Sequence, residues 1–341
     1  MPFEIIRGDI TLVKADAIVN TANPDPVIGS GVDTGIHKKA GPKLLEARKK
    51  IGPIAAGQAA VTRAFDLDAK FVIHAVGPVW EGGSRGEEAL LRQCYDNALA
   101  LAVKKRCKSA AFPLLSAGNY GFPKAVALQI AVNAFSAFLM DHEMRIILVV
   151  FDKDAFALSE KLFQSVRSYI DEHYIREKLR EEYSVASSIN IYRAARPMAD
   201  RAPAPKSSPA MTLASAAAPA GLKEMLLKTD AGFSETLLKL IDRTGKKDAE
   251  IYKRANIDRK LFSKIRGNPA YRPSKATALA FAIALELNLD ETRDFIGRAG
   301  YALTHSSKFD IIVEYFILKK NYNVMELNET LFAFDQPLIG A

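Results

Sequence analysis

The regular alternation of short apolar runs with amphipathic segments over the first half of this chain constrains its fold most strongly. Short runs rich in β-branched residues predict strands, and apolar residues spaced three or four apart predict helices. Apolar strands separated by such helices imply an α/β fold whose sheet is covered by helices on both faces. The predicted strands are FEIIRG, AIVNTA, AAVTRAF, KFVIHAV, SAAFPLL and RIILVVF, and the predicted helices are residues 35–52, 87–106, 124–142 and 158–183.

Composition divides the 341 residues into three predicted parts. Residues 1–183 carry the α/β pattern, including its last helix. Residues 184–221 are rich in Ala, Pro and Ser and poor in large apolar side chains, which predicts a flexible linker. Residues 222–341 return to a helical pattern and predict a second, all-helical domain.

Several classes of protein are disfavoured by composition. The start, MPFEIIRGDIT, is too charged for a secretory signal, and we found no apolar run of the roughly 18 residues that a membrane span needs. Cys94 and Cys107 give neither a disulfide framework nor a metal-ligand spacing, and the five histidines are scattered. We therefore expect a cytoplasmic protein without a metal, a cofactor or a membrane partner. The net charge of +8 fits a polyanionic partner or simply a basic soluble protein.

Two glycine-bearing loops follow predicted strands: IGSGVDTG at residues 28–35 and LLSAGNYGFP at residues 114–123. Glycine permits positive φ and close backbone approach, so consecutive N–H groups can surround a phosphate. The G-x-G-x-x-x-G spacing does not match the dinucleotide fingerprint. Because ligands of α/β folds bind at the carboxyl ends of strands, two such loops there suit a diphosphate.

The motifs GDIT, IVNTANP, GSGVDTGIH, IHAVGP and FPLLSAGNYGFP occur in that order, and together they resemble the macrodomain, an ADP-ribose-binding module. The resemblance covers roughly residues 1–174. It implies a three-layer α/β/α sandwich with a mixed sheet.

The resemblance also implies roles for residues at the adenine end of the ligand. Asp9 would accept a hydrogen bond from the adenine amino group, with Ile10 beside it, and Phe151 would stack on the adenine. The alternatives are that Asp9 caps a turn and that Phe151 belongs to the core, in which case Phe156 is the second candidate for stacking.

At the other end, Asn20 and Asn23 match the amides near the distal ribose, although Asn side chains also bond their own turns. Asn23 is the stronger candidate, because Pro24 favours an extended backbone before it. The remaining ligand-binding residues implied by the resemblance are Ser30, Gly31, Val32, Ser116, Ala117, Gly118, Asn119 and Tyr120, the last beside the distal ribose.

Asp33 places a carboxylate within a loop that otherwise suits an anion. A carboxylate and a bound anion repel each other, so a loop built only to bind an anion would avoid it. A hydrolase needs a base or water-orienting group at the sugar end, and Asp33 matches the catalytic Asp of hydrolytic macrodomains of the MacroD type. Asn23 would hold the ribose, and His37 would tune the charge of Asp33. The alternatives are that Asp33 caps a helix beginning near Gly35 and that His37 is only a surface or packing residue.

In the C-terminal segment, a predicted helix containing Ile251 meets a turn at residues 256–258, and a second helix follows with Leu261, Phe262 and Ile265 pointing inward. Over about residues 233–301 this pattern resembles an Xre-like helix-turn-helix. That arrangement suits the major groove of DNA or a partner protein. The side chains predicted to point outward from the second helix are Arg259, Lys260, Lys264 and Arg266.

The resemblances leave three functions open. The first is hydrolysis of ADP-ribose esters, either on protein Asp and Glu side chains or in O-acetyl-ADP-ribose. The second is a non-catalytic ADP-ribose sensor that regulates transcription. The third is an antitoxin-like eraser whose C-terminal domain binds an ADP-ribosyltransferase.

Overall fold

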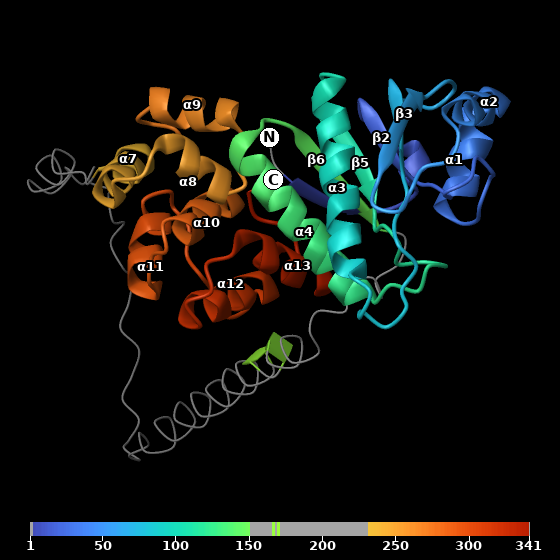
Figure 1. The fold of residues 1–341 in the computed structure, drawn as a ribbon. Coiled ribbons are helices and arrows are strands. Elements are labelled where there is room, and N and C mark those ends of the chain that lie inside the picture. The colour runs from blue at the N-terminus through green and yellow to red at the C-terminus, as the bar shows by residue number, and fades with distance from the viewer. Residues whose placement is uncertain (1–2, 151–165, 168, 171–230, 341) are drawn as a thin grey trace, which may run out of the picture.

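The structure is a computed structural model with an α/β region and a helical region that lie against each other (Figure 1). The residues that it describes are 3–150, 166, 167, 169, 170 and 231–340.

The α/β region is built on one mixed sheet, and all six predicted strands are present. The strand order is β1-β6-β5-β2-β4-β3. All neighbouring strands pair in parallel except β3, which is antiparallel to β4. The strands are β1 Phe3–Arg7, β2 Ala17–Thr21, β3 Ala59–Arg63, β4 Phe71–Ala75, β5 Ser109–Pro113 and β6 Arg145–Val150.

Helices cover both faces of this sheet, as the sequence pattern predicts. In β6, Ile146 and Leu148 join a core with α3 and α4, whereas Ile147 and Val149 face the opposite core with α1 and α2. This two-residue alternation is what a strand buried on both faces requires. The helices are α1 Val32–Ala40, α2 Pro42–Ile51, α3 Glu87–Lys104 and α4 Lys124–Asp141.

The prediction of one helix over residues 35–52 is wrong. The structure has two helices there, and α1 begins earlier, at Val32. The break falls at Gly41, which has a φ of +80° that favours glycine, and Pro42 then opens α2. Proline suits a first helical position because its missing N–H would have no partner there.

By length and composition alone, α4 could cross a membrane, so the sequence reading overlooked one apolar run within the described residues. The helix contacts both α3 and α8, and its apolar residues belong to the core under the sheet. A core helix of a globular protein has the same composition.

The C-terminal region is helical, as predicted, with its own apolar core. Val166 belongs to this core, and Tyr169 and Ile170 pack against it. The rest of the predicted helix over residues 158–183 and the predicted linker lie outside the described residues. The helices are α7 Phe233–Thr244, α8 Asp248–Arg254, α9 Arg259–Gly267, α10 Lys275–Ala284, α11 Leu289–Gly297, α12 Lys308–Leu318 and α13 Val324–Ala333.

The two regions meet at the β1 edge of the sheet. The Phe3 amide donates to Asn256 Oδ1 at 2.7 Å, and Asn256 Nδ2 donates back to the Phe3 carbonyl at 2.9 Å. Both hydrogen bonds are buried. Nearby, Tyr252 of α8 donates to Glu143 at 3.1 Å. The amide of Asn256 thus satisfies backbone groups that an edge strand would otherwise leave unpaired.

Candidate functional site

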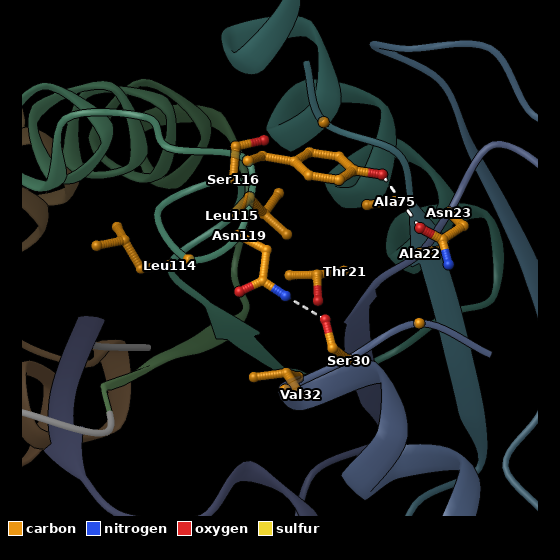
Figure 2. A pocket seen from close by; sticks show the side chains of 15 residues that line it. Thr21, Ala22, Asn23, Ser30, Val32, Ala75, Leu114, Leu115, Ser116 and Asn119 are labelled. Carbon is orange, nitrogen blue, oxygen red and sulfur yellow. Dashed lines mark hydrogen bonds between the residues drawn. The ribbon is translucent and has the colours of Figure 1, made fainter. Parts of the chain in front are cut away.

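A cavity of about 210 Å³ opens where the carboxyl ends of β2, β4 and β5 meet (Figure 2). Both predicted glycine loops contribute to its wall, so the structure brings together segments nearly 90 residues apart, as the Asn119–Ser30 contact across it shows. The lining residues are Thr21, Ala22, Asn23, Gly29, Ser30, Gly31, Val32, Ala75, Gly77, Leu114, Leu115, Ser116, Gly118, Asn119 and Tyr120.

The first loop enters the N-terminus of α1 without a side-chain cap. Gly31 is the N-cap residue, with φ +62° and ψ −126°, and no side chain accepts from the first turn. The first N–H groups of a helix have no partner within the helix, and they carry the positive end of its dipole. This wall of the cavity is therefore suited to a phosphate.

The second loop places a hydroxyl against the cavity wall. Ser116 has φ +61° and is buried, and its Oγ has no hydrogen-bond partner among the described residues. Gly77 lies so close that a Cβ added there would collide with this Oγ. Across the cavity, the Asn119 amide donates to the Ser30 hydroxyl, so the side chains of the two loops meet (Figure 2).

Asn23 and Tyr120, both predicted for the distal ribose, are neighbours in the cavity. The Tyr120 hydroxyl donates to Asn23 Oδ1 at 3.3 Å, and Asn23 Nδ2 donates to the Val27 carbonyl at 3.3 Å. Burial raises the pKa of Tyr120, and the charge of Asp33 adds to the effect. Tyr120 therefore remains a neutral hydrogen-bonding group near pH 7.

Asp33 lies beneath the first loop and is not among the residues that line the cavity. It is only 2 % exposed. Asn20 Nδ2 donates to its Oδ1 at 2.5 Å, and the Gly29 amide donates to its Oδ2 at 2.5 Å. Because the carboxylate accepts from the loop before α1, it anchors that loop and does not cap the first turn of the helix.

One histidine, His37, lies against this carboxylate, and a second, His74, lies nearby with its ring centre 6.3 Å from that of His37. His37 Nε2 lies 3.5 Å from Asp33 Oδ1, and burial lowers the pKa of His37 although Asp33 opposes the effect. His74 is fully buried on β4, with its Nε2 3.0 Å from the Thr62 hydroxyl. Burial lowers the pKa of His74 to about 3, so its imidazole is neutral.

Sequence reasoning missed Arg48, a buried arginine of α2. Its guanidinium donates to the Asn23 carbonyl at 3.2 Å and to the Pro24 carbonyl at 2.9 Å. The signal was its spacing: Arg48 stands one helical turn after Leu44, a core residue, and so shares its buried face.

At the predicted adenine end, Asp9 performs the capping role that we gave as its alternative. Its Oδ1 accepts from the Thr11 amide at 2.8 Å and caps the short 3-10 helix Ile10–Leu12. Ile10 is buried. Neither Asp9 nor Ile10 lines the cavity. Phe151 and Phe156 lie outside the described residues.

In the helical region, α8 and α9 form the predicted pair of helices around a turn. Asn256 has φ +56°, and the Asp258 carboxylate caps α9 by accepting from the Leu261 amide at 2.8 Å. Phe262 and Ile265 are buried as predicted. Leu261, also predicted to point inward, is partly buried.

The cations predicted on α9 are exposed, but two of them have partners. Arg259 and Lys260 lie at its start. Arg266 pairs with Asp248 of α8, and the ammonium of Lys264 lies 5.4 Å from the centre of the Tyr271 ring. Among the described residues, no group of three or more His, Cys, Asp or Glu side chains could hold a metal ion.

Comparison with known proteins agrees with the arrangement of the α/β region. The model of the Macro domain family matches residues 19–131. A protein of Enterobacter sp. (strain 638) named O-acetyl-ADP-ribose deacetylase is 47% identical over 165 residues, which are 47% of this chain and 92% of that protein. The protein of the same name from Escherichia coli (strain K12) is 43% identical over 164 residues, 46% of this chain and 93% of that protein. The chain belongs to the Macro domain family.

Among solved structures, the macrodomain of Oceanobacillus iheyensis with ADP is 35% identical, with a TM-score of 0.45. The match covers 49% of this chain and 92% of the other.

Proposed function

We propose that this chain binds ADP-ribose in the cavity at the strand ends and hydrolyses ADP-ribose esters, including O-acetyl-ADP-ribose. The observation that carries the proposal is the cavity itself. The uncapped N-terminus of α1 and the Asn23–Tyr120 pair both line this cavity. Relatives that the chain matches over nine-tenths of their length are named O-acetyl-ADP-ribose deacetylases.

The two loops suit opposite sides of a diphosphate. The first-turn N–H groups of α1 would supply donors from one side, and the backbone of Ser116, Gly118 and Asn119 would supply them from the other. In this orientation, the Asn23 amide and the Tyr120 hydroxyl would bond the hydroxyls of the distal ribose. Adenine contacts by Asp9, Ile10 and Phe151 remain predictions from the family resemblance.

The reaction is ester hydrolysis. Water adds to the ester group at the distal ribose, the bond between ribose and acyl group breaks, and free ADP-ribose and a carboxylate leave with one released proton. The Asp33 carboxylate cannot touch a ligand directly in this structure, because the loop covers it and both its oxygens accept hydrogen bonds. We propose that it acts by holding Gly29 and by placing negative charge under the ribose end. Direct orientation of the water by Asp33 stays a prediction.

The test is turnover of O-acetyl-ADP-ribose, and of a protein carrying ADP-ribose on Asp or Glu, by the full chain. We expect Asn23→Ala to lower kcat by roughly tenfold to a thousandfold, the effect of removing one positioned polar group. Asp33→Asn should also lose turnover while calorimetry still detects ADP-ribose binding. Tight ADP-ribose binding by the wild type without turnover of either ester would overturn the enzymatic function and favour a sensor.

We propose a second role for the helical region, which is contact of α9 with the phosphates of nucleic acid. Exposure of Arg259 and Lys260 at the start of a capped helix after a tight turn supports it. We expect the full chain to bind duplex DNA with an affinity that falls as salt rises, and the Arg259→Ala/Lys260→Ala variant to show a shallower salt dependence. A stoichiometric protein complex without any affinity for DNA would contradict this role and favour a protein partner.

A further inference from the structure

Arg48 is a buried cation whose donors are directed to the backbone just outside the cavity. It is 2 % exposed, and its guanidinium spans three carbonyl groups. Two of them, of Asn23 and Pro24, belong to the segment that follows β2, and the third is that of Gly52 at the end of α2. Arginine is suited to this task because its planar fork holds several donors in fixed directions.

The hydrogen bond from Arg48 to the backbone carbonyl of Asn23 is important, because the side chain of Asn23 is weakly held. Both hydrogen bonds of its amide are 3.3 Å long. By contrast, Arg48 donates to Pro24 at 2.9 Å, and the Ile54 amide donates to the same carbonyl at 2.9 Å. The main chain at Asn23 is therefore held by Arg48, at 3.2 Å from its own carbonyl, and through the neighbouring Pro24 by Arg48 and by Ile54, which follows α2.

Asn23 also packs directly against the loop that Asp33 anchors. A Cβ added to Gly29 would lie 2.7 Å from Asn23 Nδ2 and 3.3 Å from Asp33 Oδ2. Asn23, Gly29 and Asp33 therefore form one packed unit. A shift of the segment at Asn23 would therefore also move the first glycine loop, which lines the cavity.

The charge of Arg48 acts on the same unit. Burial lowers the pKa of Arg48, and the carboxylates of Asp33 and Asp25 partly oppose this effect. Arg48 in turn lowers the pKa of His37 and of His74, in both cases adding to the larger effect of burial. The groups around His37 are therefore Asp33 on α1, Arg48 on α2 and His74 on β4, with one negative and one positive charge.

We propose that Arg48 is a positioning residue for ester hydrolysis, which fixes the main chain of Asn23 at the cavity. The inference rests on the proposed function, because it concerns the same site. It adds a residue of α2 that neither lines the cavity nor touches a ligand.

Two substitutions in the full chain separate the hydrogen bonds of Arg48 to the three carbonyls, which we call the clamp, from its positive charge. Arg48→Lys keeps a positive charge but has one donor atom, which cannot span three carbonyls. Arg48→Met removes both. Lys50→Met, an exposed position of the same helix, is the matched control for loss of one charge from α2. The measurements are kcat and KM for O-acetyl-ADP-ribose, calorimetric binding of ADP-ribose, and the NMR titration of His37.

We expect both Arg48 variants to lose about tenfold to a hundredfold in kcat, because a displacement of about 1 Å at a reacting group has that effect. ADP-ribose affinity should change by less than about threefold, since the phosphate-binding loops remain. The pKa of His37 should rise in Arg48→Met and stay at the wild-type value in Arg48→Lys. Lys50→Met should match the wild type in every measurement.

If the wild type turns over and both Arg48→Lys and Arg48→Met turn over at the wild-type rate, the inference is overturned and the proposed function stays intact. A loss confined to KM and ADP-ribose affinity would also overturn it, because that pattern indicates a general effect on binding. Absence of turnover in the wild type is a different outcome, which overturns the proposed function itself. If Arg48→Met does not fold, Arg48→Lys alone is decisive. A loss of kcat with an unchanged pKa of His37 supports the role of the hydrogen bonds from Arg48, and a wild-type kcat overturns it.

Discussion

The two halves of this protein begin most of their α-helices in different ways. In the α/β region, α1, α2, α3 and α4 start at Gly31, Gly41, Gly86 and Pro123, and no side chain caps any of them. In the helical region, α7 and α8 also lack a side-chain cap, but α9 to α13 are each capped by a side chain. The capping residues are Asp258, Ser274, Asn288, Ser307 and Asn323.

The difference separates binding from stability. A side-chain cap satisfies the free N–H groups of a helix start and typically stabilises it by about 1 kcal/mol. At α1 no side chain caps those groups, and Gly31 and Val32 line the cavity, where an anion could accept from them. The α/β region thus leaves backbone donors open at its site, whereas α9 to α13 use theirs internally.

The largest effect that we predict concerns the contact between the two halves. Asn256→Ala leaves the amide and carbonyl of Phe3 buried without partners, so we expect a loss of about 2 to 4 kcal/mol in unfolding free energy. Asn256→Gly tolerates the positive φ and isolates the loss of the side-chain amide. The single tryptophan, Trp80, lies in the α/β region.

In the variants, the urea transitions of Trp80 fluorescence and of far-UV circular dichroism should separate, because the halves unfold less cooperatively. If the two probes stay coincident and both midpoints match the wild type, the halves do not depend on this contact.

The next effect breaks the open helix start. Gly31→Ala forces a side chain into a backbone conformation with φ +62° and ψ −126°, which costs about 1 to 3 kcal/mol. We expect the Kd for ADP-ribose to rise by roughly tenfold to a hundredfold. The control is Gly297→Ala in α11, where an added Cβ meets nothing within 4 Å. Equal calorimetric affinity of Gly31→Ala and wild type would show that this loop does not hold the ligand.

The two halves should also respond to pH in opposite directions. Burial lowers the pKa of His74 in the folded chain to about 3, so below pH 6.5 the unfolded chain takes up a proton and the folded chain does not. Stability therefore falls as pH drops from 6.5 towards 3.

Burial, reinforced by Glu326, raises the pKa of Glu329 in α13 to about 8. The unfolded chain then loses a proton first, so stability falls as pH rises from 4.5 to 8.

Glu329→Gln removes the second effect. Between pH 5 and pH 8, its stability relative to wild type should grow by up to about 1.4 kcal/mol per pH unit, measured by urea unfolding. Glu88→Gln, at an exposed position, should follow the wild type. A parallel pH dependence for Glu329→Gln and wild type would contradict the burial of this carboxyl.

The smallest effect tests the capped helices. Asn288 accepts from the amides of Asp290 and Glu291 and forms a capping box with Glu291. Asn288→Ala should cost about 1 kcal/mol of unfolding free energy, without a change in the calorimetric affinity for ADP-ribose. A weaker ADP-ribose affinity in this variant would mean that the helical region contributes to the site.

The sequence predicted the elements of the fold well because period-two and period-3.6 patterns are local signals. All six strands were confirmed, whereas the predicted helix over residues 35–52 begins earlier, at Val32, and is interrupted at Gly41 and Pro42. The contact between Phe3 and Asn256 could not be predicted, since 253 residues separate them and a buried amide leaves no pattern in the sequence.

The site was predictable where residue type and place coincide. The glycine loops, Asn23 and Tyr120 do meet in one cavity. The burial of Asp33 was not predictable, because the bond from Gly29 depends on how the loop closes. Arg48 was missed for another reason. Although its spacing from Leu44 places it on the buried face, its charged neighbours in EARKK are typical of a solvated helix face.

The most direct test of this account is the release of ADP-ribose from O-acetyl-ADP-ribose by the full chain, compared between wild type and Asn23→Ala at equal concentrations. We expect turnover by the wild type and a large loss of kcat in the variant. Equal rates in both proteins, or no release by a wild type that binds ADP-ribose, would contradict it.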